Sequence, residues 1–146
     1  MLSELRVAEL LAAIGERTPA PASGAATALT AALAAALAEL ASRFAGAEAD
    51  AERAHALVAE LLRLGDEDAV AYAAFMAERS GATRAEIVRV PEEIATRADE
   101  VVGLALRAAD KLSSAVAGDA EAAAELARAA ARVARGLAQL NRSWGS

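Results

Sequence analysis

The sequence predicts an all-α protein, a single-domain antiparallel bundle of five or six alanine-rich helices. Alanine occupies 46 of the 146 positions, and it is the residue with the highest helix propensity. Runs of β-branched and aromatic residues, which are typical of strands, are missing. The segments between helical patterns are short, which favours antiparallel neighbours. We therefore expect one domain over residues 1–146 and essentially no sheet.

The first two helices are predicted from the spacing of apolar residues. A stripe of leucines opposite charged residues indicates a helix over about residues 3–15, and the Pro19–Pro21 segment cannot continue it. A second helix begins near Ser23 or Gly24 and extends to about Ala45. Because it is apolar on nearly every side, we expect it to be the central helix. Its larger side chains recur every three or four positions, at Leu29, Leu33, Leu37, Leu40 and Phe44.

A glycine divides the next helical pattern. We expect a third helix over about residues 47–64, with Leu57, Val58, Leu61 and Leu62 directed inward. Gly65 then ends that helix, since glycine commonly terminates helices. Asp66 is the expected cap of a fourth helix over about residues 67–79.

The last two helices contain a proline and a capping residue. Thr83-Arg84-Ala85-Glu86 indicates a capping box after a turn at Ser80-Gly81-Ala82. The fifth helix continues to about Leu112, and Pro91 is expected to kink or break it. After a loop over residues 113–118, Asp119 is expected to cap a final helix that frays after Asn141. Its larger apolar residues are Leu126, Val133, Leu137 and Leu140.

Composition excludes several classes of site and partner. The chain has no cysteine and one histidine, His55, which excludes thiolate and multi-histidine metal sites and argues against a Ser-His-Asp triad. A net charge of -6 and an aromatic content of 3% argue against nucleic-acid binding. The most apolar run, Gly24–Ala38, is uncharged but shorter than the roughly 20 residues of a membrane span. We expect a cytoplasmic protein that uses no metal or cofactor.

Two acids at the predicted start of the fourth helix are the main candidates for chemistry. Asp66 and Asp68 would point about 200° apart on a helix, so one caps and the other faces inward. Asp68 would lie in the first turn, where the helix dipole holds its pKa down. A purely structural role for both acids also fits. The functional hypothesis is that Asp68 meets the free backbone amides of Ser23-Gly24 in one cavity.

These segments, taken in order, resemble the cyclodeaminase/cyclohydrolase family. The most distinctive match is Asp66-Glu67-Asp68-Ala69-Val70-Ala71-Tyr72, an acid, any residue, then Asp-Ala with an aromatic three residues after that alanine. The Arg17–Ala26 segment resembles the Pro-Gly-rich loop that precedes the long Ala-rich helix of the family. Val90–Ala95 and Gly118–Asn141 resemble later parts of the pattern, so the resemblance covers nearly the whole chain.

The resemblance implies a fold like the C-terminal domain of formiminotransferase-cyclodeaminase, a homodimer and a folate-binding cleft. It implies a catalytic role for Asp68 in the hydrolysis of the C=N bond of 5,10-methenyltetrahydrofolate, or in a related ring opening or closing. A tetrahydrofolate derivative is then the small-molecule substrate. The substrate-binding residues carried over are Pro21, Ser23, Gly24, Thr27, Tyr72, Asp119 and Asn141.

A second functional hypothesis rests on differences from the family pattern. The triple-glycine loop of the family corresponds here to Ala22-Ser23-Gly24, and the basic run after its long helix is absent beyond Arg43. The alternative is therefore a non-catalytic helical homodimer that keeps the scaffold with a degenerate site.

Overall fold

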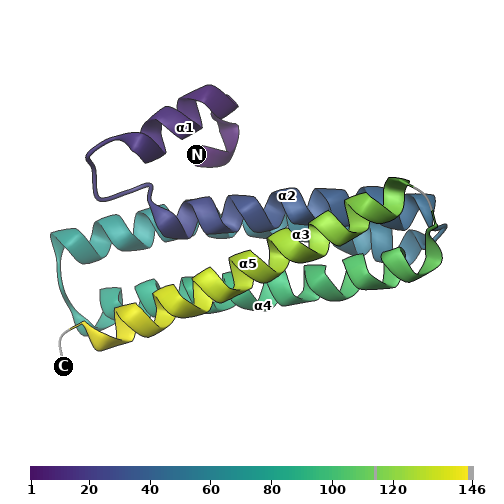
Figure 1. Ribbon diagram of the computed structural model, residues 1–146. Coiled ribbons are helices and arrows are strands. Elements are labelled where there is room, and N and C mark those ends of the chain that lie inside the picture. The colour runs from purple at the N-terminus through teal and green to yellow at the C-terminus, as the bar shows by residue number, and fades with distance from the viewer. Residues whose placement is uncertain (114, 145–146) are drawn as a thin grey trace.

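The computed structural model describes residues 1–113 and 115–144, and within these ranges it contains helices and no strand (Figure 1). The elements are a short 3-10 helix η1 (Leu2–Glu4) and five α-helices: α1 (Val7–Gly15), α2 (Ser23–Phe44), α3 (Glu48–Ala77), α4 (Gly81–Lys111) and α5 (Ala115–Ser143). The predicted all-α fold is confirmed. The first predicted helix, however, is divided into η1 and α1.

The four long helices form the bundle, and α1 lies beside the first half of α2 (Figure 1). Helix α2 packs on α3 and α5, and α4 packs on the same two helices. The connections after α2 and α3 span only residues 45–47 and 78–80, so the chain reverses direction at each. The start of α2, the end of α3 and the end of α5 therefore lie at the same end of the bundle (Figure 1).

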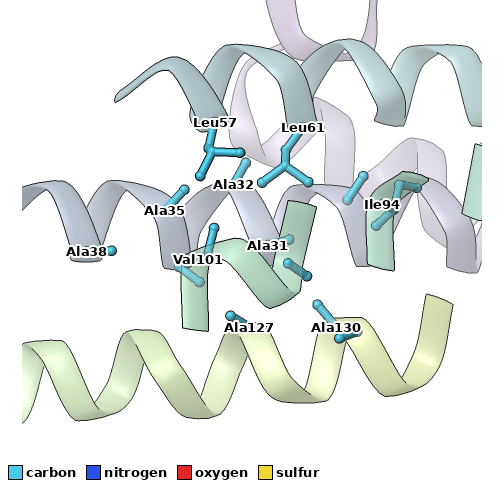
Figure 2. Packing of buried hydrophobic residues seen from close by; sticks show 14 of the residues in the cluster. Ala31, Ala32, Ala35, Ala38, Leu57, Leu61, Ile94, Val101, Ala127 and Ala130 are labelled. Atoms are coloured by element: carbon cyan, nitrogen blue, oxygen red, sulfur yellow. The ribbon is translucent and has the colours of Figure 1, made fainter. Parts of the chain in front are cut away.

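The core face of α2 is made of alanine. The buried residues of this helix include Ala28, Ala31, Ala35 and Ala38, whereas Leu33 and Phe44 are 67% and 66% exposed. Helix α2 contacts α3, α4 and α5, as expected of a central helix, but its remaining face is open. Alanine allows helix axes to approach to about 8 Å, and larger residues of α3 and α4 fill the space between them. Leu57, Leu61, Ile94 and Val101 belong to the same buried cluster, and Figure 2 shows them around Ala31, Ala32 and Ala35 of α2.

Helix α3 continues through Gly65 and Asp66, so the predicted helix end at Gly65 is wrong. A β-carbon on Gly65 would lie 3.4 Å from the Cβ of Ala28 on α2. Glycine inside a helix costs roughly 0.5–1 kcal/mol, which is too little to end a helix that has buried residues on both sides of Gly65. Two helices in the sequence pattern are thus one helix of 30 residues.

Asp66 does not cap a helix of its own. Its buried carboxylate accepts hydrogen bonds from the backbone N–H of Leu2 at 2.6 Å and from the Ser3 hydroxyl at 2.8 Å. Asp66 therefore connects η1 to α3 through hydrogen bonds. The local sequence does not indicate this long-range role.

Helix α4 is also continuous, and Pro91 does not break it. Its N-cap is Ser80, whose side chain accepts the N–H of Thr83, while the Ser80 N–H donates to the Thr83 hydroxyl. The capping box therefore lies three residues before the predicted one, because Thr83 takes the place expected for Glu86. Helix α5 likewise begins upstream of Asp119, which lies inside the helix and is not its cap.

One helix among the described residues, α2, is long and apolar enough to cross a membrane by length and composition. About half of that segment (56%) is buried against the other helices of the bundle. A buried core helix has the same composition, so this feature is weak evidence for a membrane span. The uncharged run considered in the sequence is part of this longer helix.

Candidate active site

A cavity of about 180 Å³ lies where the start of α2, the end of α3 and the end of α5 meet. Its wall is formed by Asp68 and Tyr72 of α3, by the loop and first residues of α2, by Pro91 of α4 and by the end of α5. The wall residues are Pro19, Ala20, Ala22, Ser23, Gly24, Asp68, Tyr72, Pro91, Leu137, Leu140, Asn141 and Trp144. The predicted convergence of Asp68 with the Ser23-Gly24 segment is therefore present in one chain.

Asp68 lies directly against the first turn of α2. A β-carbon on Gly24 would lie 2.2 Å from both carboxyl oxygens of Asp68, so the side chain occupies space that only glycine leaves free. The carboxylate also accepts a hydrogen bond from the backbone N–H of Ala25. That N–H belongs to the first turn of α2 and has no partner within the helix. Asp68 thus satisfies one of the free amides at the start of α2.

Burial raises the pKa of Asp68 to about 6, and the hydrogen bond from Ala25 opposes the shift. The expectation that a helix dipole lowers this pKa is therefore wrong. Asp68 lies deep inside α3, far from the first turn of its own helix, and desolvation outweighs the amide of α2. A carboxyl group with this pKa can accept and return a proton near neutral pH.

The sequence and the fold were compared with known families and solved structures. Residues 6–143 match the family model described as formiminotransferase-cyclodeaminase. The chain belongs to the formiminotransferase-cyclodeaminase family. The fold is similar to that of formiminotetrahydrofolate cyclodeaminase from Thermotoga maritima, with a TM-score of 0.91 and 21% identity, over 97% of this chain and 80% of that chain. Among curated proteins, none matches the chain significantly.

The aromatic part of this family member's cavity combines residues from the middle and the end of the described sequence. Tyr72 lies one helical turn after Asp68, and its ring centroid is 6.3 Å from that of Trp144. Trp144 also contacts the buried Phe75, with ring centroids 6.1 Å apart. The only tryptophan of the chain therefore stands in the cavity wall.

The other predicted site residues divide into two groups. Ser23, Gly24, Tyr72 and Asn141 line the cavity together with Asp68. Pro21 and Thr27 lie beside it but not in its wall; the Thr27 hydroxyl donates to the Ser23 carbonyl at 2.6 Å and so belongs to the first turn of α2. Asp119 lies near the start of α5, at the opposite end of the bundle (Figure 1).

Seven wall residues were not among the predicted site residues: Pro19, Ala20 and Ala22 of the loop before α2, and Pro91, Leu137, Leu140 and Trp144. Leu137 and Trp144 stand four before and three after Asn141, so helical spacing from that asparagine indicates both. Pro91 was predicted to kink or break its helix and belongs to the Val90–Ala95 part of the family pattern, but it was not predicted to line a site. Its place in the wall depends on the packing of α4 against α5.

The charge of the wall is set by one group. Of the described wall residues, only Asp68 has an ionisable carboxyl group, and none is lysine or arginine. Within residues 1–113 and 115–144, no group of three or more His, Asp or Glu side chains is arranged to hold a metal ion. The chemistry of this cavity is therefore that of one carboxyl group among apolar, aromatic, hydroxyl and amide neighbours.

Proposed function

We propose that the protein is an enzyme of folate one-carbon metabolism that acts on the C=N bond of a methenyl or formimino adduct of tetrahydrofolate. Family membership supports the general role. The observation that carries the proposal is the Asp68 carboxyl group, with a pKa raised to about 6, held in a cavity against the start of α2.

In the proposed hydrolysis of 5,10-methenyltetrahydrofolate, water adds to the carbon of the cationic N–C=N bridge. Asp68, as the carboxylate, takes one proton from that water as the C–O bond forms. It then returns the proton to one bridge nitrogen as the C–N bond to that nitrogen breaks. The second proton of the original water leaves to solvent as the formyl C=O forms, so one proton is released overall.

The walls of the cavity support the same assignment. A cationic bridge needs no positive protein group beside it, and the wall supplies none. Tyr72 and Trp144 offer aromatic surface for a flat ring, and a cation near such faces is favoured. Anionic parts of a folate would extend out of this cavity, since no lysine or arginine of the described wall meets them.

The test compares Asp68→Asn with Asp66→Asn, two isosteric changes two positions apart on α3. The absorbance of 5,10-methenyltetrahydrofolate is followed with each purified protein, corrected for its spontaneous hydrolysis. We expect Asp68→Asn to lose at least 100-fold in kcat, as general acid–base catalysis typically contributes about 10²–10⁴-fold. Asp66→Asn should retain activity, because Asp66 contacts η1 and not the cavity.

The second candidate function is a non-catalytic homodimer with a degenerate site. The absence of lysine and arginine from the described cavity wall favours it, because folates are anionic. The fluorescence of Trp144 separates the two candidates, since this residue stands in the wall. A wild-type protein that neither hydrolyses the substrate nor shows a fluorescence change with it supports the second candidate and refutes the first.

We also propose that two copies of the chain associate through α2. Leu33, Leu40 and Phe44 are exposed on this helix, and Leu33 lines an apolar groove between α1 and α2. The accessible surface of the chain is 7567 Å², against about 7,000 Å² expected for a compact monomer of this mass. A second copy would cover the open face of α2 and the groove, where α1 has no buried residue. The homodimer that the family resemblance implies supports the same partner.

A further inference from the structure

Pro91 leaves a backbone carbonyl of α4 without its usual donor. In an α-helix the N–H of residue 91 would bond to the carbonyl of Ile87, but proline has no N–H. Ile87 and Pro91 are both buried, so water is not an easy replacement. A buried carbonyl is normally hydrogen-bonded by some other group.

Asn141 of α5 supplies that donor. Its side-chain Nδ2 donates to the Ile87 carbonyl oxygen at 2.6 Å, and the residue is only 8% exposed. Because a carbonyl can only accept, the nitrogen end of the amide must face Ile87. The oxygen end, Oδ1, is then directed away from Ile87, and no donor to it is found within residues 1–113 and 115–144.

Pro91 and Asn141 both line the cavity that contains Asp68. We propose that Pro91 is a positioning residue. Because it leaves the Ile87 carbonyl free to accept from Asn141 Nδ2, it fixes the orientation of the Asn141 amide, and this fixed orientation is the lock. The Oδ1 atom of Asn141 is then a hydrogen-bond acceptor for an N–H group of a ligand. The ligand class is a nitrogen ring that carries N–H donors. The identification of that ring with a reduced folate rests on the proposed function, whereas the lock itself does not.

The lock is tested by giving residue 91 an N–H. In Pro91→Ala and in the bulkier Pro91→Val, the backbone can bond to Ile87 and displace Asn141. The chain contains one asparagine and one glutamine, so its NMR spectrum holds only two side-chain amide pairs, and Asn141→Ala assigns them. We expect one Asn141 Nδ2 proton to be protected from exchange in the wild type and to lose that protection in both variants. An unchanged amide signal would overturn the lock.

A double-mutant cycle gives a second readout of the lock. Asn141→Asp places a second oxygen against the Ile87 carbonyl and should lower the midpoint of thermal unfolding. In Pro91→Ala/Asn141→Asp the carbonyl is already bonded, so the same substitution should cost less. Additive changes in the two backgrounds would show that the two residues act independently.

The role of Asn141 Oδ1 as a hydrogen-bond acceptor is tested with small-molecule probes, independently of catalysis. Millimolar 2-aminopyrimidin-4-one, which carries N–H donors, should shift the Asn141 amide signals of the wild type, and pyrimidine, which has none, should not. Equal responses, or none to either probe, would overturn the acceptor role even if the lock holds.

The last test compares the steady-state kinetics of the wild type and the two Pro91 variants. If 5,10-methenyltetrahydrofolate is a substrate, both Pro91 variants should raise its KM about five- to tenfold, the worth of one hydrogen bond, and keep kcat and its pH profile. A change confined to kcat would contradict a positioning role. Failure of the wild type to act on this substrate would refute the proposed function, while the amide and probe experiments would still decide the lock and the acceptor.

Discussion

The carboxyl group of Asp68 fills the place where a β-carbon of residue 24 would stand. The separation would be 2.2 Å from either carboxyl oxygen, far inside van der Waals contact. Gly24 and Asp68, which are 44 positions apart in the sequence, are therefore in close contact. The requirement for glycine comes from this contact and not from backbone conformation, since the only glycine with positive φ among the described residues is Gly46.

We predict that Gly24→Ala displaces Asp68 and lowers kcat/KM for the methenyl substrate about 100-fold, the cost of a misplacement near 1 Å. Steady-state kinetics with circular dichroism as a check on folding provide the measurement. Gly136→Ala is the matched control, because a β-carbon there meets nothing within 4 Å. The control should gain about 0.5–1 kcal/mol in the free energy of unfolding, as expected for glycine inside a helix. Full activity of Gly24→Ala would show that the position of Asp68 does not depend on glycine at residue 24.

The raised pKa of Asp68 predicts a pH-dependent cost to stability. Because the folded state holds the proton up to pH about 6, whereas an unfolded aspartate releases it near pH 4, the folded chain binds more protons between these values. The free energy of unfolding contributed by this group therefore falls as pH rises from about 4 to 6, and is constant above.

Asp68→Asn removes this cost and should stabilise the protein at pH 7 while abolishing activity. We expect a gain of about 2 kcal/mol, after allowing for partial solvation of the group. Urea unfolding at pH 7 and pH 4 measures it, and the difference between variant and wild type should disappear at pH 4. A gain of equal size at both pH values would mean that the pKa of Asp68 is not raised.

Asp66 supports the N-terminal segment and not the cavity. Asp66→Ala removes the acceptor of the Leu2 N–H and the Ser3 hydroxyl, so η1 should detach from α3. We expect faster hydrogen exchange at residues 2–5 and a loss of about 1–3 kcal/mol in the free energy of unfolding. Exchange rates within α4 and α5 serve as the internal reference. Unchanged exchange at residues 2–5 would show that other contacts hold the segment.

Leu33→Arg tests the proposed association through α2. The wild type should scatter light as a species of twice the 14.8 kDa chain mass, and the variant should be monomeric at the same concentration. Leu33 is exposed in the single chain, so the substitution should leave the thermal midpoint of the monomer nearly unchanged. Ala85→Arg, on an exposed position of α4, adds the same charge elsewhere and should remain dimeric. A monomeric wild type would refute the interface.

Local sequence patterns predict which segments of this chain are helical better than they predict where the helices end. The breaks expected at Gly65 and Pro91 are absent because both residues are compensated by partners on other helices. Gly65 packs against Ala28 of α2, and the carbonyl freed by Pro91 accepts a hydrogen bond from Asn141 of α5. Neither partner can be identified from the neighbouring residues in the sequence.

The candidate site, too, was predicted only in part. The resemblance selected Asp68, Gly24, Tyr72 and Asn141, and the structure brings all four to one cavity. It did not select Pro91 or Trp144, whose roles depend on how α4 and α5 pack. The sign of the Asp68 pKa shift was also wrong, because it depends on burial and on the neighbouring helix.

The sequence by itself determines an all-helical chain, the family pattern and the residues able to carry proton transfer. Helix propensity and apolar spacing are properties of short segments, and they are readable without a fold. Only the tertiary structure decides which face of α2 is buried, what Asp66 holds and the protonation of Asp68. These depend on groups brought together from distant positions, since desolvation and close contact arise only when helices pack.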